Sequence, residues 1–211
     1  MLLTVKRAGG ALALALIIAA CGGSSRDSAV PLAPTPSNAL AACQKMALTR
    51  AMCPSRLPML SGHAVVLSAA CLDSAGARVP LASRRCRTAA WSLIGAPPGP
   101  ATIAHVVITA SPDSWQCTWP HELRARAASD RLLNPNRRRA ALLPSVQWYG
   151  QSGQLVLAPP FARGGGLVGG HLEFCFRANR VNYAVTLHAW APLAQVVATL
   201  KALVGSALHH R

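Results

Sequence analysis

Four histidines fall in segments with the pattern of β-strands: His63, His105, His171 and His188. Imidazole titrates near neutral pH and is the commonest side-chain ligand for transition metals, so four of them converging in one sheet could bind a metal or transfer protons. No H-x-H pair places two imidazoles on one face of the same strand. The sequence therefore favours independent histidines at sheet edges and assigns no metal ligand and no cofactor.

Two fragments of catalytic motifs stand in the wrong context. His121-Glu122 begins like the H-E-x-x-H of zinc proteases, but Ala125 occupies the position of the second histidine. The glycine-rich run at residues 164–169 matches G-x-G-x-x-G, yet a strand pattern follows it where a dinucleotide site needs a helix. We interpret this run as a hairpin connection.

The sequence contains few of the residue patterns that support hydrolysis. The chain has no G-x-S-x-G and no S-x-x-K arrangement that would activate a serine. Its carboxylates are Asp27, Asp73, Asp113, Glu122, Asp130 and Glu173, and glycoside hydrolysis needs two of them close together. No catalytic residue is assigned, and a non-enzymatic protein is favoured.

Cysteines indicate an oxidising compartment. Besides Cys21 the chain contains Cys43, Cys53, Cys71, Cys86, Cys117 and Cys175. No two have the C-x₂₋₄-C spacing of a zinc site, so disulfides are favoured over a metal cluster. The even number leaves the connectivity open, and proximity in sequence favours Cys43–Cys53 and Cys71–Cys86, with Cys117–Cys175 as a long-range bond.

The chain is strongly basic, with a formal charge of +15 and a pI near 11.2. Arginines cluster at Arg84, Arg85, Arg87, Arg137, Arg138 and Arg139, which are candidate anion-binding residues for anionic lipid or cell-wall polymer. The alternative is that arginine is simply abundant and solvated on the surface. No nucleic-acid-binding fold signature accompanies these clusters, so nucleic acid is the disfavoured partner.

The elements that must position these residues are mostly strands. Enrichment in β-branched residues and flanking Pro and Gly predict strands over 63–70 and 103–110, and residues 89–94 have strand character. Further strands at 145–150, 153–158, 170–177 and 181–190, separated by turn residues, predict an antiparallel meander. Helices are predicted at 40–46, 122–133 and 192–204, the last ending at Gly205, with an extended segment at 115–119. The five tryptophans are interpreted as core residues.

Alternation also predicts two faces for the meander strands. In the third strand, Leu172, Phe174 and Phe176 share one face, and His171, Glu173, Cys175 and Arg177 share the other. The final helix should cover one face, which gives an α+β domain of an antiparallel sheet packed against a C-terminal helix, with disulfides. A meander followed by a terminal helix resembles the Mog1/PsbP-type fold.

The N-terminus has the features of an export signal. Lys6 and Arg7 precede an uncharged run over residues 8–20 that is shorter than the roughly 20 residues of a spanning helix. Residues 18–21, Ile-Ala-Ala-Cys, resemble the bacterial lipobox, which implies cleavage before Cys21 and acylation of that cysteine. We expect a signal peptide over 1–20, the lipidated cysteine and a Gly/Ser/Pro-rich tether over 21–38, and one globular domain over 39–211.

These features predict a lipid-anchored envelope protein with a non-enzymatic binding or assembly role. The resemblance of residues 18–21 to a lipobox implies a location on the outer face of the cytoplasmic membrane, or on the outer membrane of an organism with two membranes. One alternative is an extracytoplasmic hydrolase built from scattered His, Glu and Arg residues, which a pocket joining His171, Glu173 and His188 would favour. The other is a polyanion-binding protein that uses the arginine clusters.

Overall fold

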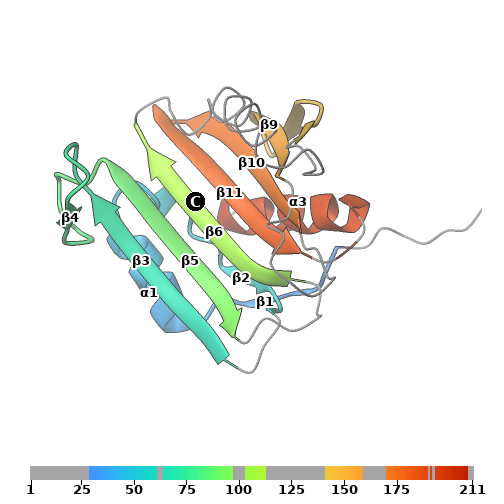
Figure 1. Ribbon diagram of the computed structural model, residues 1–211, viewed down its shortest axis with the longest axis horizontal. Coiled ribbons are helices and arrows are strands. Elements are labelled where there is room, and N and C mark those ends of the chain that lie inside the picture. Colours follow the sequence, from blue (N-terminus) through green and yellow to red (C-terminus); the bar gives the residue numbers. More distant parts are fainter. Residues whose placement is uncertain are drawn as a thin grey trace, which may run out of the picture.

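The computed structural model describes residues 29–60, 64–96, 103–112, 141–158, 170–189, 191 and 193–208. Within these ranges the architecture is a broad antiparallel sheet with helices on one face (Figure 1). The α+β class and the antiparallel sheet packed against a C-terminal helix are confirmed. None of the described helices has the length and apolar character needed to cross a bilayer.

Nine strands form the main sheet in the order β4-β3-β5-β6-β11-β10-β9-β7, with β8 paired to β9. All the pairings between them are antiparallel. The strands are β3 (Ala64–Leu72), β4 (Arg78–Val79), β5 (Thr88–Ala96), β6 (Ile103–Ser111), β7 (Ala141–Leu142), β8 (Val146–Trp148), β9 (Gln151–Ala158), β10 (Gly170–Ala178) and β11 (Val181–Ala189). Consecutive pairing of β8, β9, β10 and β11 confirms the predicted meander.

One face of the sheet carries the core. Helix α1 (Ser37–Lys45) contacts β3 and β5, and helix α3 (Leu193–Leu208) contacts β10 and β11. Both helices lie behind the sheet in Figure 1. A small second sheet pairs β1 (Leu32–Pro34) with β2 (Arg56–Pro58), and β2 contacts α3. Burying this apolar layer is the main favourable term in folding.

The side chains on this face are those that alternation predicted. Leu172, Phe174 and Phe176 of β10 are all buried in the core, and the side chains of Arg177 and His171 point to the other face. Trp91 is completely buried, and its indole N–H donates to the Ala39 carbonyl over 2.9 Å. Trp91 and Trp148 are therefore core residues, as interpreted from sequence.

Helix α3 does not end where the sequence suggested. It continues through Gly205 to Leu208, so Gly205 is not a C-terminal cap. A Cβ at Gly205 would lie 2.6 Å from the Tyr149 ring, a contact too short for any larger side chain. The glycine is there because the helix packs closely against the β8–β9 turn, and only the tertiary structure shows this.

Two of the predicted disulfides are present, Cys43–Cys53 and Cys71–Cys86, with Cα–Cα separations of 5.7 and 5.4 Å. Cys175 is also disulfide-bonded. Its predicted partner, Cys117, lies outside the described residues, so that pairing stays a prediction. The first bond ties α1 to the chain before β2, and the second closes the β3–β5 connection that carries β4.

Regular structure begins before the predicted domain boundary at residue 39. The Val30 N–H donates to Thr199 Oγ1 over 2.9 Å, β1 starts at Leu32 and α1 starts at Ser37. The last part of the predicted tether is therefore packed against the domain. Prolines and small residues signalled a linker, whereas here they form a short edge strand and the first turn of a helix.

Candidate metal centre

Three adjacent strands place a histidine in the same row of the sheet. His188 of β11 pairs with His105 of β6 on one side and with His171 of β10 on the other. All three side chains lie on the face opposite the core, because the neighbouring residues Val106, Leu172 and Leu187 are buried in it. Facing residues on adjacent strands have Cβ atoms about 4.5–5.5 Å apart, so the three imidazoles must meet.

The imidazole rings are in contact. Ring centroids are 4.2 Å apart for His171 and His188, 4.8 Å for His105 and His188, and 5.1 Å for His105 and His171. The Nε2 atoms of His105 and His171 are separated by 3.2 Å. One donor nitrogen from each ring can be chosen so that all three lie within 4.8 Å of one another.

These separations are close to those of a metal site. Zn–N bonds of about 2.0–2.1 Å in tetrahedral geometry place two ligand nitrogens roughly 3.3–3.4 Å apart. The His105–His171 pair is already at this spacing. The third ring needs to move by no more than about 1.5 Å to complete a three-nitrogen site.

A bulge lies beside the row. The pairing of β6 with β11 shifts register between His188 and Ala189, so that Ala189 pairs with Ile103, and Ala104 has no partner on β11. Ile103 and Ala104 are both buried although they are consecutive. Such an irregularity redirects the side chains next to it, and here it adjoins His105 at the beginning of the strand.

The same row reaches solvent on the β3 side. It continues from His105 to Ile94 of β5 and Val66 of β3, which are 40% and 51% exposed. The three histidines themselves are partly buried. The row of partly buried imidazoles therefore continues into side chains that are exposed to solvent.

Burial holds two of the imidazoles neutral. Desolvation first, and then the charge of a protonated His188, lower the pKa of His105 to about 4. The pKa of His171 is also lowered to about 4, by desolvation first and then by His188 and His105. At neutral pH both rings are uncharged and can act as nitrogen donors.

A carboxyl group lies next to the histidines in the neighbouring row. Glu173 is two residues after His171 on β10 and pairs with Thr186, which is two residues before His188 on β11. The Thr186 hydroxyl donates to Glu173 Oε2 over 3.0 Å. Burial raises the pKa of Glu173, and the Thr186 hydrogen bond partly opposes that shift.

Three imidazoles form a donor set that suits borderline transition metals. Zn²⁺, Cu²⁺, Ni²⁺ and Co²⁺ bind imidazole well, whereas Mg²⁺ and Ca²⁺ prefer oxygen ligands. Two carboxylates are needed for acid–base hydrolysis of glycans, and this face contributes Glu173 alone among the described residues. The arrangement therefore favours metal binding.

The expectation that the strand histidines are independent is wrong for three of them. Each strand contributes one histidine, so the sequence contains no local motif. The alignment of the three histidines in one row depends on the order and register of β6, β11 and β10. The sequence offered a weaker indication than a motif would: three histidines lie near the ends of predicted strands, on the polar face of each strand. His63 and His121 lie outside the described residues, as does the glycine run at 164–169.

The arginine candidates lie at the other end of the sheet. Arg84, Arg85 and Arg87 are exposed on the loop before β5, and Arg177 and Arg180 are exposed at the β10–β11 turn. Pairing of Leu72 with Thr88 and of Arg177 with Asn182 shows that these loops share one end of the sheet. Arg137, Arg138 and Arg139 are not among the described residues.

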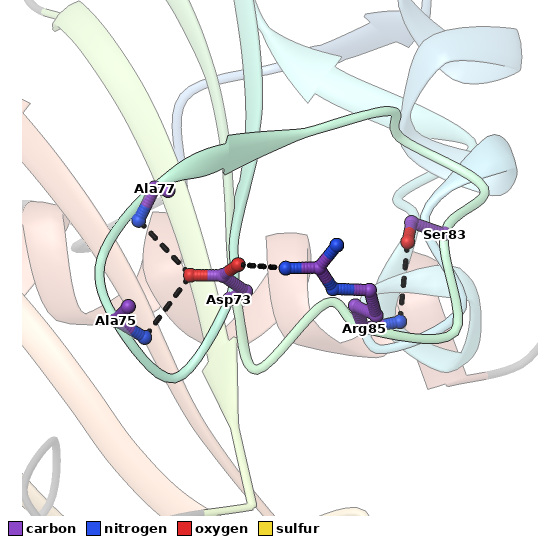
Figure 2. A network of polar contacts seen from close by, with 5 residues as sticks. All are labelled: Asp73, Ala75, Ala77, Ser83 and Arg85. Carbon is purple, nitrogen blue, oxygen red and sulfur yellow. Dashed lines mark hydrogen bonds and ion pairs between the residues drawn. The ribbon is translucent and has the colours of Figure 1, made fainter.

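Arg85 has a structural contact of its own. Its Nη2 atom lies 2.8 Å from Oδ2 of Asp73, as Figure 2 shows. Asp73 Oδ1 accepts the backbone N–H groups of Ala75 and Ala77, both over 3.0 Å. These N–H groups and Arg85 lower the pKa of Asp73 against the opposing effect of desolvation. Arg84 and Arg87 remain the better candidates for binding an external anion.

No protein-family model matches this chain, and neither the curated proteins nor the solved structures include a similar one.

Proposed function

We propose that this chain is a lipid-anchored protein of the bacterial cell envelope that binds a divalent transition-metal ion through His105, His171 and His188. The observation that carries the proposal is the row of three contacting imidazoles contributed by three adjacent strands. Zinc is the ion we expect first, because three histidine nitrogens are a common zinc donor set.

The physical cost of the cluster supports this role. Three partly buried imidazoles in mutual contact repel one another when protonated and gain little from packing. Well-packed apolar side chains at the same positions would stabilise the sheet at least as well. Binding of one ion by all three ring nitrogens would offset this cost.

The first experiment is a zinc titration of the full chain, processed and acylated in a bacterial host and extracted in detergent. We expect one zinc ion per chain, measured by competition with a chromophoric chelator. His105→Gln, His171→Gln and His188→Gln should each weaken binding by more than 100-fold, since loss of an outer-sphere partner alone costs about 10- to 100-fold. Glutamine keeps much of the length of histidine without a ring nitrogen.

The control is Arg84→Gln, which replaces an exposed side chain at the opposite end of the sheet. Its zinc affinity should equal that of the unaltered chain. Zinc binding that survives all three row substitutions would refute the proposed site.

The lipid anchor is proposed from the lipobox-like residues 18–21. Two acyl chains hold a protein stably on a membrane, since each buried methylene contributes about 0.8 kcal/mol. Mass spectrometry of the protein from membranes should find an acylated Cys21 peptide and no peptide from residues 1–20. Cys21→Ser should release the protein from the membrane fraction, and a Cys21→Ser protein that stays membrane-bound would contradict the anchor.

A second candidate function is binding of an anionic polymer or lipid surface by the arginine end of the sheet. Exposed Arg84, Arg87, Arg177 and Arg180 favour it, together with the scarcity of acids: Asp73 and Glu173 are the only ones in the described ranges. Heparin serves as a probe polyanion. Retention on it should fall steeply with salt, and replacing these four arginines with glutamine should abolish it. Equal retention of the fourfold variant would exclude this surface.

A further inference from the structure

The two described acidic residues, Asp73 and Glu173, differ in how many of their carboxylate oxygens have a partner. Both oxygens of Asp73 are used, one by two backbone N–H groups and the other by the Arg85 guanidinium (Figure 2). Glu173 uses one oxygen, with Thr186. Its second oxygen, Oε1, is buried and has no hydrogen-bond partner among the described residues.

This arrangement is costly for a carboxylate. A buried acceptor without a partner costs about 1–3 kcal/mol, and more when the group is charged. No basic side chain in the described part of the chain forms an ion pair with Glu173. Buried polar atoms without a partner are rare in folded proteins, and binding of an ion is one role that accounts for such an atom.

Glu173 lies in the row next to the three histidines, although its carboxylate is not one of the ligand groups that lie within 4.8 Å of one another. It lies on the same face as the three histidines, two residues from His171 along β10 and opposite Thr186 across the strand pair. Residues two apart on a strand are separated by about 6.5–7 Å between Cα atoms, which a glutamate side chain leaning along the strand can span. The Thr186 hydroxyl occupies Oε2, and Oε1 has no hydrogen-bond partner among the described residues, so a change of side-chain rotamer could turn it toward the imidazoles.

We propose that Glu173 completes the metal centre, with Oε1 as the fourth ligand to the ion held by His105, His171 and His188. This inference rests on the proposed metal binding. The carboxylate supplies negative charge against the divalent ion, and three nitrogens with one oxygen form a closed tetrahedral set. A closed set holds an ion for storage, delivery or structure, whereas an open fourth position would serve catalysis.

The test compares the zinc affinity of Glu173→Gln with that of the full unaltered chain by chelator competition. Glutamine keeps the shape and can still accept from Thr186, but it carries no charge and is a poor zinc ligand. We expect affinity to fall by at least about tenfold. Asp73→Asn is the matched control, because it removes the same charge at the opposite end of the sheet, and its affinity should be unchanged.

A second measurement observes the glutamate carboxyl groups directly. Glu122 and Glu173 are the only glutamates in the chain, so protein labelled with ¹³C at the glutamate carboxyl gives two signals. Zinc should shift one of them, the signal that Glu173→Gln removes. If the unaltered chain binds zinc while Glu173→Gln binds it within twofold and neither signal moves, the role of Glu173 is overturned and the three-histidine site stands. If the unaltered chain binds no zinc, both proposals fail.

Discussion

The Nε2 atoms of His105 and His171 lie 3.2 Å apart, although the two residues are 66 positions apart in sequence and sit on strands that are not neighbours. His188, on the strand between them, contacts both rings. A neutral pair at this distance shares one proton as a hydrogen bond. An ion bound between the rings would replace that proton with a divalent charge.

Zinc should stabilise the folded protein. A ligand that binds only the native state, at a free concentration 100 times its dissociation constant, adds about 2.7 kcal/mol to the free energy of unfolding. Urea unfolding followed by tryptophan fluorescence should show this gain in the unaltered chain, with reversal by a chelator. His171→Gln should show no gain, and a variant stabilised as much as the unaltered chain would place the ion elsewhere.

Gly153→Ala should destabilise the protein by about 1–3 kcal/mol, the typical cost of overpacking. An added Cβ would lie 2.6 Å from the Cys175 carbonyl oxygen and 2.7 Å from Cζ of Phe174, a completely buried ring. Neither the ring nor the backbone of β10 has room to move away. Urea unfolding measures the loss, and Ser152→Ala at the exposed neighbouring position should stay within about 0.5 kcal/mol of the unaltered chain.

Removal of the Cys71–Cys86 bond should cost about 3 kcal/mol, because the bond closes a 15-residue separation in the unfolded chain. The double variant Cys71→Ala/Cys86→Ala tests this by chemical unfolding under oxidising conditions. Cys43→Ala/Cys53→Ala, which opens a separation of 10 residues, should cost slightly less. An unchanged unfolding midpoint in both variants would mean that the bonds do not constrain the unfolded chain.

Asp73 should give the stability of the protein a defined pH dependence. Its pKa is lowered first by the Ala77 N–H and also by the Ala75 N–H and Arg85. A carboxyl group with a lowered folded-state pKa stabilises the fold above its unfolded-state pKa, near 4, and loses that contribution as pH falls through the folded-state value.

Unfolding experiments at pH 7, 5 and 3 check this. Asp73→Asn should be less stable than the unaltered chain at pH 7 and 5, and the difference should shrink at pH 3. Arg85→Gln should cost less than Asp73→Asn at neutral pH, since both backbone N–H groups remain. A difference that stays constant down to pH 3 would show that the Asp73 charge does not contribute.

The sequence by itself determined the elements and most of their faces. Enrichment in β-branched residues identified β3 and β6. Period-2 alternation identified the faces of β10 and β11, because a strand with one buried face must alternate. It also identified Leu172, Phe174 and Phe176 as one face of β10. Proximity gave Cys43–Cys53 and Cys71–Cys86, since each pair is joined by a short connection.

Only the tertiary structure decided which residues of different helices and strands contact one another. Gly205 looked like a helix stop because glycine commonly ends helices, and only the approach of Tyr149 shows its role. The metal centre depends on β11 being inserted between β6 and β10, and on a register that brings His105, His188 and His171 into one row. A shift of one residue would turn each imidazole to the opposite face. Strand order and register are set by the packing of the whole sheet, so no local pattern around a single histidine contains them.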